Sequence, residues 1–176
     1  GVPDGVLTNM SDVVDHCRRI TRMVDVSLMV DAEDGFGNAV NVARTVREME
    51  GVGVSAIEIE DNFVAKRFNV ADPGLVSKEE QVGKLEAAVA ARTDPTTVIV
   101  ARSAALALTS LDEALDRIQA YSQTGAEALM LRSELVLHSR GRRGGKGSEM
   151  KKRGEQRTEG EKRGSPAQVI RREVDR

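Results

Sequence analysis

The feature that most constrains this chain is a repeat of four short apolar runs, each followed by polar residues and then by a helical pattern. The runs cover residues 26–30, 54–59, 97–101 and 126–131. Their centres lie about 30 to 40 residues apart, which is the spacing of βα units in a parallel sheet. The sequence therefore predicts an α/β protein with about four βα units.

A polar residue that can cap a helix stands before each helical pattern. We expect helices to begin at Ser11-Asp12, Asn38, Ser77 and Ser110, because side-chain oxygens at these positions can accept hydrogen bonds from the first free backbone N–H groups. The residues expected to face the core from these helices, together with three methionines, are Val13, Val14, Cys17, Ile20, Met29, Val42, Val46, Met49, Val82, Leu85, Val89, Leu115, Ile118, Tyr121 and Met130.

Composition agrees with this class. Aromatic residues make up only 2% of the chain, so the core must consist of aliphatic residues, alanine and methionine, as suits buried parallel strands covered by helices. The single cysteine, Cys17, rules out an internal disulfide and indicates a reducing, cytoplasmic setting. The sequence contains neither a membrane-spanning apolar run nor a signal peptide. Because it opens with Gly1 in a loop-like stretch, we expect it to be a fragment.

Charge divides the chain into two parts. Residues 139–176 contain 13 Lys/Arg and 6 Asp/Glu, which leaves 13 basic and 22 acidic residues for the remainder. We therefore expect a folded part over 1–138 and a disordered basic tail over 139–176. The tail has no aromatic residues to stack bases and its glutamates dilute its positive field, so no nucleic-acid partner is expected.

Alternation of strands and helices leaves two architectures open, a doubly wound sheet and a (β/α)8 barrel. Charged residues follow three of the apolar runs, at Asp31, at Glu60-Asp61 and at Arg102. Both folds place their sites at this edge of the sheet, but three charged strand exits in a row favour a barrel mouth. No nucleotide-binding glycine motif follows the first run, which argues against the doubly wound alternative.

The stretch DAEDGFGN after the first run suggests a metal site. Asp31 and Glu33 are two residues apart at a strand end, and Glu60 follows the neighbouring strand. Carboxylates crowded together repel one another unless a cation lies among them, and oxygen ligands suit Mg²⁺. Gly35 would leave room for a ligand beside the metal. The alternative is a polar loop whose side chains only cap the following helix.

Four segments carry a resemblance to a known family. These are GVPDGVLT (1–8), VDAEDGFGNAVNVARTVREME (30–50), IEIEDNFVAKRF (57–68) and VIVARSAALALTSLDEALDRIQAYSQTGAEALML (98–131). In content and order they resemble the isocitrate lyase/phosphoenolpyruvate mutase family, over residues 1 to about 132. The resemblance implies a partial TIM (β/α)8 barrel with Mg²⁺, or Mn²⁺ in its place, at the mouth.

The resemblance also assigns residues. It implies that Asp31, Glu33 and Glu60 occupy the metal-site positions, that Asp4 lies on a mobile catalytic loop, and that Arg102 contacts the substrate, a small 2-oxo dicarboxylate, near Gly35. Family members form homo-oligomers. We expect no membrane partner.

Within the family, the segment after Glu60 lacks the cysteine loop of the lyases and is most similar to the oxaloacetate decarboxylase branch. The alternatives are phosphoenolpyruvate mutase activity, methylisocitrate lyase-like activity, and a non-catalytic truncated barrel with a basic interaction tail. Glu33 stands where the family usually has Asp, and the inward-facing Glu58 requires a partner, because an unpaired buried carboxylate is costly. Arg132 is expected to be a rim charge rather than a site residue. Four strands of eight would leave two open edges, so we expect the isolated chain to be poorly stable.

Overall fold

The computed structural model describes residues 8–63 and 74–132. Within these ranges, four strands form one parallel sheet in the order β1-β2-β3-β4. The predicted α/β class and the four βα units are confirmed. The tail over 139–176, with its predicted disorder, lies outside the described residues. The strands are β1 (Met29–Asp31), β2 (Ala56–Glu60), β3 (Val98–Ser103) and β4 (Ala128–Leu131).

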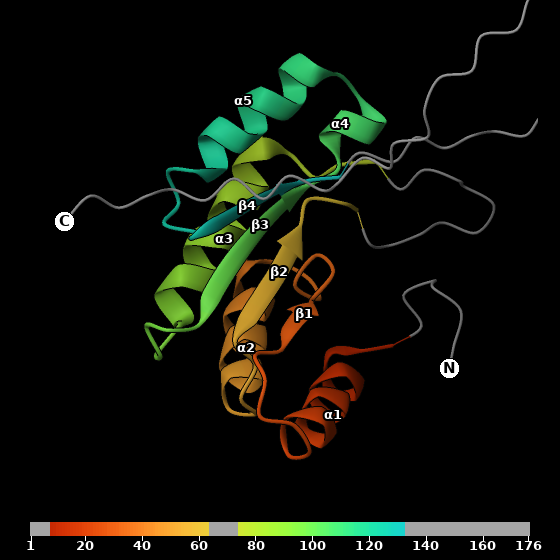
Figure 1. Ribbon diagram of the computed structural model, residues 1–176. Coiled ribbons are helices and arrows are strands. Elements are labelled where there is room, and N and C mark those ends of the chain that lie inside the picture. The colour runs from red at the N-terminus through yellow and green to blue at the C-terminus, as the bar shows by residue number, and fades with distance from the viewer. Residues whose placement is uncertain (1–7, 64–73, 133–176) are drawn as a thin grey trace, which may run out of the picture.

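Helices connect the strands in the way that a parallel sheet requires. Figure 1 shows α2 and α3 next to each other along one face of the sheet, with α5 beside α3 and α1 against α2. Each strand-to-strand connection therefore crosses over through a helix, as in a (β/α)8 barrel. The helices are α1 (Met10–Thr21), α2 (Ala39–Glu50), α3 (Lys78–Ala91), the short α4 (Ala105–Leu108) and α5 (Leu111–Tyr121).

Helix starts follow the capping residues closely. The Asn38 side chain accepts from the N–H groups of Val40 and Asn41, and the Asn41 side chain accepts from the Asn38 N–H in return. Ser77 and Ser110 also cap their helices as predicted. The first helix was expected to begin at Ser11-Asp12, but its cap is Asn9, because the Asn9 side chain and that of Asp12 form a reciprocal capping box.

Side chains alternate along the central strands, so the sheet has one side that faces the helices and an opposite side that carries the predicted site residues, here called the site-facing side. Ile57, Ile59, Ile99 and Ala101 are fully buried and pack with apolar residues of the helices. Since successive side chains of a strand point to opposite faces, Glu58, Glu60 and Arg102 lie on the other face. Among the helices of the described ranges, none has the length and apolar character that a membrane crossing demands.

Three expectations about the core were wrong. The first strand begins at Met29 rather than at residue 26, and both Val26 and Met29 are exposed. Leu115 is exposed as well, because the face of α5 that packs against the sheet carries Ala114, Arg117 and Tyr121 instead. On this face, Arg117 Nη1 lies 3.4 Å from Oδ2 of the buried Asp61. Cys17 is buried, as expected.

Candidate active site

Arg102, near the end of β3, is the centre of the polar cluster on the site-facing side of the sheet. Its Nη1 donates to Asp31 Oδ2 at 3.0 Å and also to Glu58 Oε1. Its Nε lies 3.3 Å from Glu60 Oε2. Strand register explains this convergence, because Asp31 pairs with Glu58 across β1 and β2, and Glu60 pairs with Arg102 across β2 and β3. One guanidinium therefore joins three strands.

The members of this cluster differ in burial. The side chain of Glu58 is 4% exposed and that of Glu60 is 7% exposed, against 18% for Arg102 and 53% for Asp31. Burial raises the pKa of Glu60, and the nearby Arg102 charge and the hydrogen bond from Asn62 only partly offset that effect. For Arg102, burial lowers the pKa, but the hydrogen bond to Glu58 and the charges of the three carboxylates more than compensate, so its pKa is raised. Arg102 is a permanent cation here.

The loop after β1 is held by its own backbone and side-chain bonds. Asp31 Oδ1 accepts from the Glu33 N–H at 2.8 Å, and the Glu33 carbonyl accepts from the Glu60 N–H at 2.7 Å. Glu33 and Phe36 both adopt positive φ angles, 53° and 63°, a conformation that non-glycine residues rarely adopt. Such backbone outliers cluster at functional sites, which makes this loop a candidate part of the site.

Gly35 serves the packing of this loop. Its φ is +83°, and a Cβ atom at this position would lie 2.3 Å from Val42 Cγ2 on α2. The Gly35 carbonyl accepts from Thr45 Oγ1 at 3.1 Å. The observed contacts of Gly35 are therefore with α2. A contact with substrate stays a prediction.

The three acids predicted to hold a metal are brought only partly together. Asp31 and Glu60 both reach Arg102, while Glu33 is tied to β2 through its carbonyl. Over the described ranges, no group of three or more His, Cys, Asp or Glu side chains is arranged as a metal-ligand set. The Arg102 guanidinium lies between Asp31 and Glu60, two of the acids that were predicted to surround the ion. The sequence had predicted that Arg102 contacts the substrate instead.

The chemistry of the donors still fits a hard divalent cation. Asp31, Glu58 and Glu60 with Arg102 leave a formal charge of −2, and carboxylate oxygens are the ligands that Mg²⁺ prefers. Glu60 Oε2 is buried and makes no hydrogen bond among the described residues. Such an oxygen is a natural ligand for a cation.

Two further predicted residues can be placed or set aside. Asp4 lies outside the described residues. Arg132 follows β4, where its N–H donates to the Ser103 carbonyl at 2.9 Å. Its charge lowers the pKa of Glu60, so Arg132 lies within electrostatic reach of the cluster.

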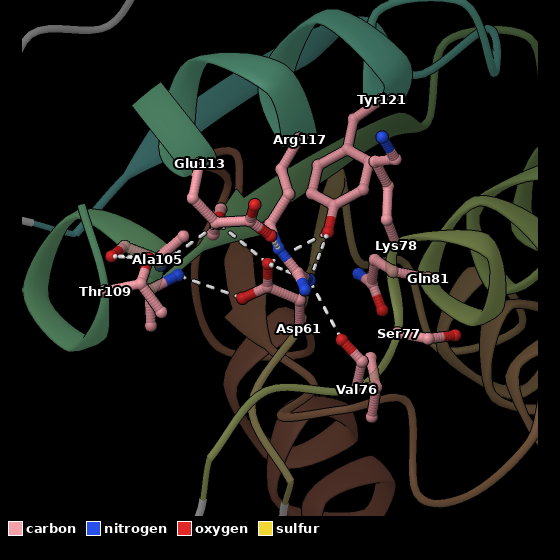
Figure 2. A network of polar contacts seen from close by, with 12 residues as sticks. Asp61, Val76, Ser77, Lys78, Gln81, Ala105, Thr109, Glu113, Arg117 and Tyr121 are labelled. Carbon is pink, nitrogen blue, oxygen red and sulfur yellow. Dashed lines mark hydrogen bonds and ion pairs between the residues drawn. The ribbon is translucent and has the colours of Figure 1, made fainter. Parts of the chain in front are cut away.

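A second polar network lies on the opposite side of the same strand ends (Figure 2). Asp61, the neighbour of Glu60, is fully buried and accepts from Ser103 Oγ at 2.7 Å, from the Ala104 N–H at 2.9 Å and from the Tyr121 hydroxyl at 2.9 Å. Arg117 Nη1 donates to the Val76 carbonyl at 2.9 Å and lies 3.4 Å from Asp61 Oδ2. This network attaches α5 to the ends of β2 and β3.

This network was not predicted from the sequence, although the sequence carries a signal for it. Asp61 was treated only as one of the strand-exit charges. If Glu60 faces the site, strand alternation sends Asp61 toward the helices, where a buried carboxylate needs donors. Arg117 and Tyr121 are one turn apart on α5 and could have been identified as those donors.

The fold and this site define a class of protein, and comparison with known proteins identifies it. The sequence profile of the phosphoenolpyruvate phosphomutase family matches residues 1–139. The chain belongs to this family, and the resemblance found in the sequence is confirmed.

Individual relatives are similar over the same region. An oxaloacetate decarboxylase of Rhodopseudomonas palustris (strain BisB18) is 46% identical over 129 residues, which are 73% of this chain and 45% of that protein. One from Bradyrhizobium diazoefficiens is 44% identical over the same shares. This chain thus spans less than half the length of these relatives.

Solved structures agree on the fold. The crystal structure of a phosphonopyruvate hydrolase in complex with oxalate and Mg²⁺ is 41% identical, with a TM-score of 0.68, over 76% of this chain and 46% of that one. The structure of an oxaloacetate acetylhydrolase with its product oxalate is 28% identical, with a TM-score of 0.68, over the same shares.

Proposed function

We propose that this chain provides part of the active site of an Mg²⁺-dependent carbon–carbon lyase, most similar to oxaloacetate decarboxylase. The observation that carries the proposal is the convergence of Asp31, Glu58 and Glu60 on Arg102 at the carboxyl edge of the sheet. The 46% identity to an oxaloacetate decarboxylase supports the choice of reaction. Because the chain spans 45% of that relative, the relative's activity is a proposal for this chain.

The reaction would convert oxaloacetate to pyruvate and CO₂. The bond between C3 and C4 breaks, C4 leaves as CO₂, and the electron pair of that bond forms the C2=C3 bond while the carbonyl pair moves onto the 2-oxo oxygen. Solvent water then protonates C3 and the 2-oxo group forms again. A divalent cation, when bound, would stabilise the negative charge that develops on that oxygen. Asp31, Glu33 and Glu60 are the residues proposed to hold the cation.

Arg102 would bind a substrate carboxylate. A guanidinium can bind a carboxylate with two parallel hydrogen bonds, and Arg102 Nη1 already donates one hydrogen bond to each of two side-chain carboxylates, those of Asp31 and Glu58. Binding would orient the substrate with its 2-oxo group toward the acids. Gly35 would form the adjacent loop wall, and Asp4 is proposed to lie on a loop that covers the substrate.

The setting of this chemistry is proposed with it. The substrate would be a small 2-oxo dicarboxylate and the compartment the cytoplasm. The homo-oligomer of the family is not carried over to this chain. Mn²⁺ is the alternative to Mg²⁺, because both accept oxygen ligands.

The test measures oxaloacetate loss with Mg²⁺, corrected for the reaction without protein, in the full chain and in Asp31→Ala. We expect the loss to depend on protein and to fall in Asp31→Ala. Equal rates in the two proteins would refute the assignment. Calorimetric titration with oxalate adds a readout that needs no turnover: Mg²⁺-dependent oxalate binding should disappear in the same variant.

A second candidate is phosphonate chemistry, and one observation favours it. The phosphonopyruvate hydrolase structure is 41% identical to this chain. Phosphonopyruvate offered in place of oxaloacetate separates the two reactions: release of inorganic phosphate, or formation of phosphoenolpyruvate, would transfer the assignment to this branch. A chain that converts neither substrate and does not bind oxalate would be the non-catalytic alternative.

A further inference from the structure

Arg102 is held unevenly by its three carboxylates. Its Nη1 donates to Glu58 and to Asp31, whereas its Nε lies near Glu60 Oε2 without forming a hydrogen bond. The Glu58 side chain is almost completely buried, and that of Asp31 is half exposed. An incoming cation would therefore reach Asp31 from solvent, while Glu58 remains behind the guanidinium.

The position of Glu58 follows from its strand. Its Cα pairs with Asp31 on one side and with Val100 on the other. The Val100 side chain is buried and apolar, and within the described ranges the cation that pairs with Glu58 is Arg102. Glu58 thus forms its ion pair with Arg102, and Arg102 also contacts Asp31 and Glu60, the acids proposed to hold a metal.

We infer that Glu58 is a positioning residue that anchors Arg102, and that Arg102 occupies the place among Asp31 and Glu60 that a divalent cation takes over. This inference rests on the proposed function, because it assumes that these acids bind a cation. When the cation binds Asp31 and Glu60, these acids no longer contact Arg102. Glu58 then holds the guanidinium at the strand end, where it can bind a substrate carboxylate. Without Glu58, Arg102 would stay on Asp31 and Glu60 and compete with the cation.

The experiment measures Mn²⁺ binding to the full chain by electron paramagnetic resonance of the free ion. We expect Arg102→Gln to bind Mn²⁺ about tenfold more tightly, because the competing guanidinium is gone, and Glu58→Gln to bind about tenfold more weakly. In the double variant, the effect of Glu58→Gln should shrink to a small fraction of that seen with Arg102 present. Thermal melts check that each variant is folded.

Two controls separate anchoring from simple charge. Glu58→Asp keeps the negative charge but is one methylene shorter, so it should behave like Glu58→Gln. Glu127→Gln removes a glutamate that pairs with Arg92 just before β4, and Mn²⁺ binding should not change.

Each outcome has a meaning. Additive effects of the two changes, or wild-type binding by Glu58→Asp, would show that Glu58 acts on the cation by charge alone and would overturn the inference. Unchanged Mn²⁺ binding in Arg102→Gln would refute the exchange of the Arg102 guanidinium for the cation, even if Glu58→Gln failed to fold. If wild type bound no Mn²⁺, both the inference and the metal-dependent function would fail, whereas binding without coupling would remove only the inference.

Discussion

The replacement Asp61→Asn tests whether the buried network on the helix side of the sheet holds α5 in place. Asp61 Oδ2 accepts from Ser103 Oγ and from the Tyr121 hydroxyl and lies 3.4 Å from Arg117 Nη1. An amide group of the same size either directs its NH₂ toward these donors or turns it toward the Ala104 N–H, which bonds to Oδ1. In both orientations a donor faces a donor, and Arg117 loses its buried counter-charge.

The magnitude follows from the burial of the pair. Removing one partner of a buried ion pair costs about 3–5 kcal/mol, because the other charge stays desolvated. Arg117 keeps its bonds to Glu113 and to the Val76 carbonyl, so we expect the lower end, about 3 kcal/mol in the free energy of unfolding. For a domain of this size that loss lowers Tm by about 10 °C.

Urea unfolding followed by circular dichroism is the assay, with Asp25→Asn as the control. Asp25 is exposed in the loop before β1, so its replacement should leave stability unchanged. If Asp61→Asn lost less than about 1 kcal/mol, the net value of an ordinary hydrogen bond, the network would not be what fixes α5 to the sheet, and the reasoning would be wrong.

The remaining predictions concern the same fold. Burial and the Asp61 charge raise the pKa of Tyr121 above its ordinary 10.0. Above pH 10 the unfolded chain therefore loses the Tyr121 proton before the folded chain does, and the free energy of unfolding falls as the pH rises. Urea titrations over this pH range should show wild type losing stability relative to Tyr121→Phe. Gly35→Ala should destabilise by more than about 2 kcal/mol from its positive φ and its clash with Val42, and Val42→Ala in the same chain should recover part of that loss. Asn38→Ala should cost about 1 kcal/mol by removing the cap of α2. Because β1 and β4 each pair with one strand in the described sheet, we expect a broad, low-temperature melt from the isolated chain, and a sharp monomeric transition at an ordinary mesophilic temperature would contradict this.

Local sequence was sufficient for the elements whose signals are local. The runs that became β2, β3 and β4 were found within a few residues, because their apolar residues are consecutive and their ends are polar. Asn38, Ser77 and Ser110 were identified as caps, since capping depends on a side chain and the next three backbone groups. The first strand was placed too early because Val26 looks like a strand residue, whereas within the described sheet the pairing of β1 with β2 begins at Met29.

Pairing across the sheet could not be read in the same way. The sequence placed Asp31, Glu60 and Arg102 at one edge, which the register confirms. It did not show that Arg102 would lie among the carboxylates, because that depends on the reach of a long side chain across β2. The partner of Glu58 was undetermined for the same reason.

The two networks share their strand ends, and this links stability to the proposed chemistry. On β2, Glu60 faces the site and Asp61 faces α5, and on β3, Arg102 faces the site and Ser103 bonds to Asp61. The backbone also joins these ends, because the Asp61 N–H donates to the Arg102 carbonyl at 3.2 Å. A shift of Asp61 would therefore change the position of Glu60 relative to Arg102. Catalysis is sensitive to small changes in the placement of such groups. It follows that Asp61→Asn should weaken Mn²⁺ binding even where the protein is still folded, whereas Asn38→Ala, which destabilises the chain at α2, should leave Mn²⁺ binding unchanged. Equal Mn²⁺ affinity in the folded Asp61→Asn protein and wild type would show that the buried network supports the fold alone.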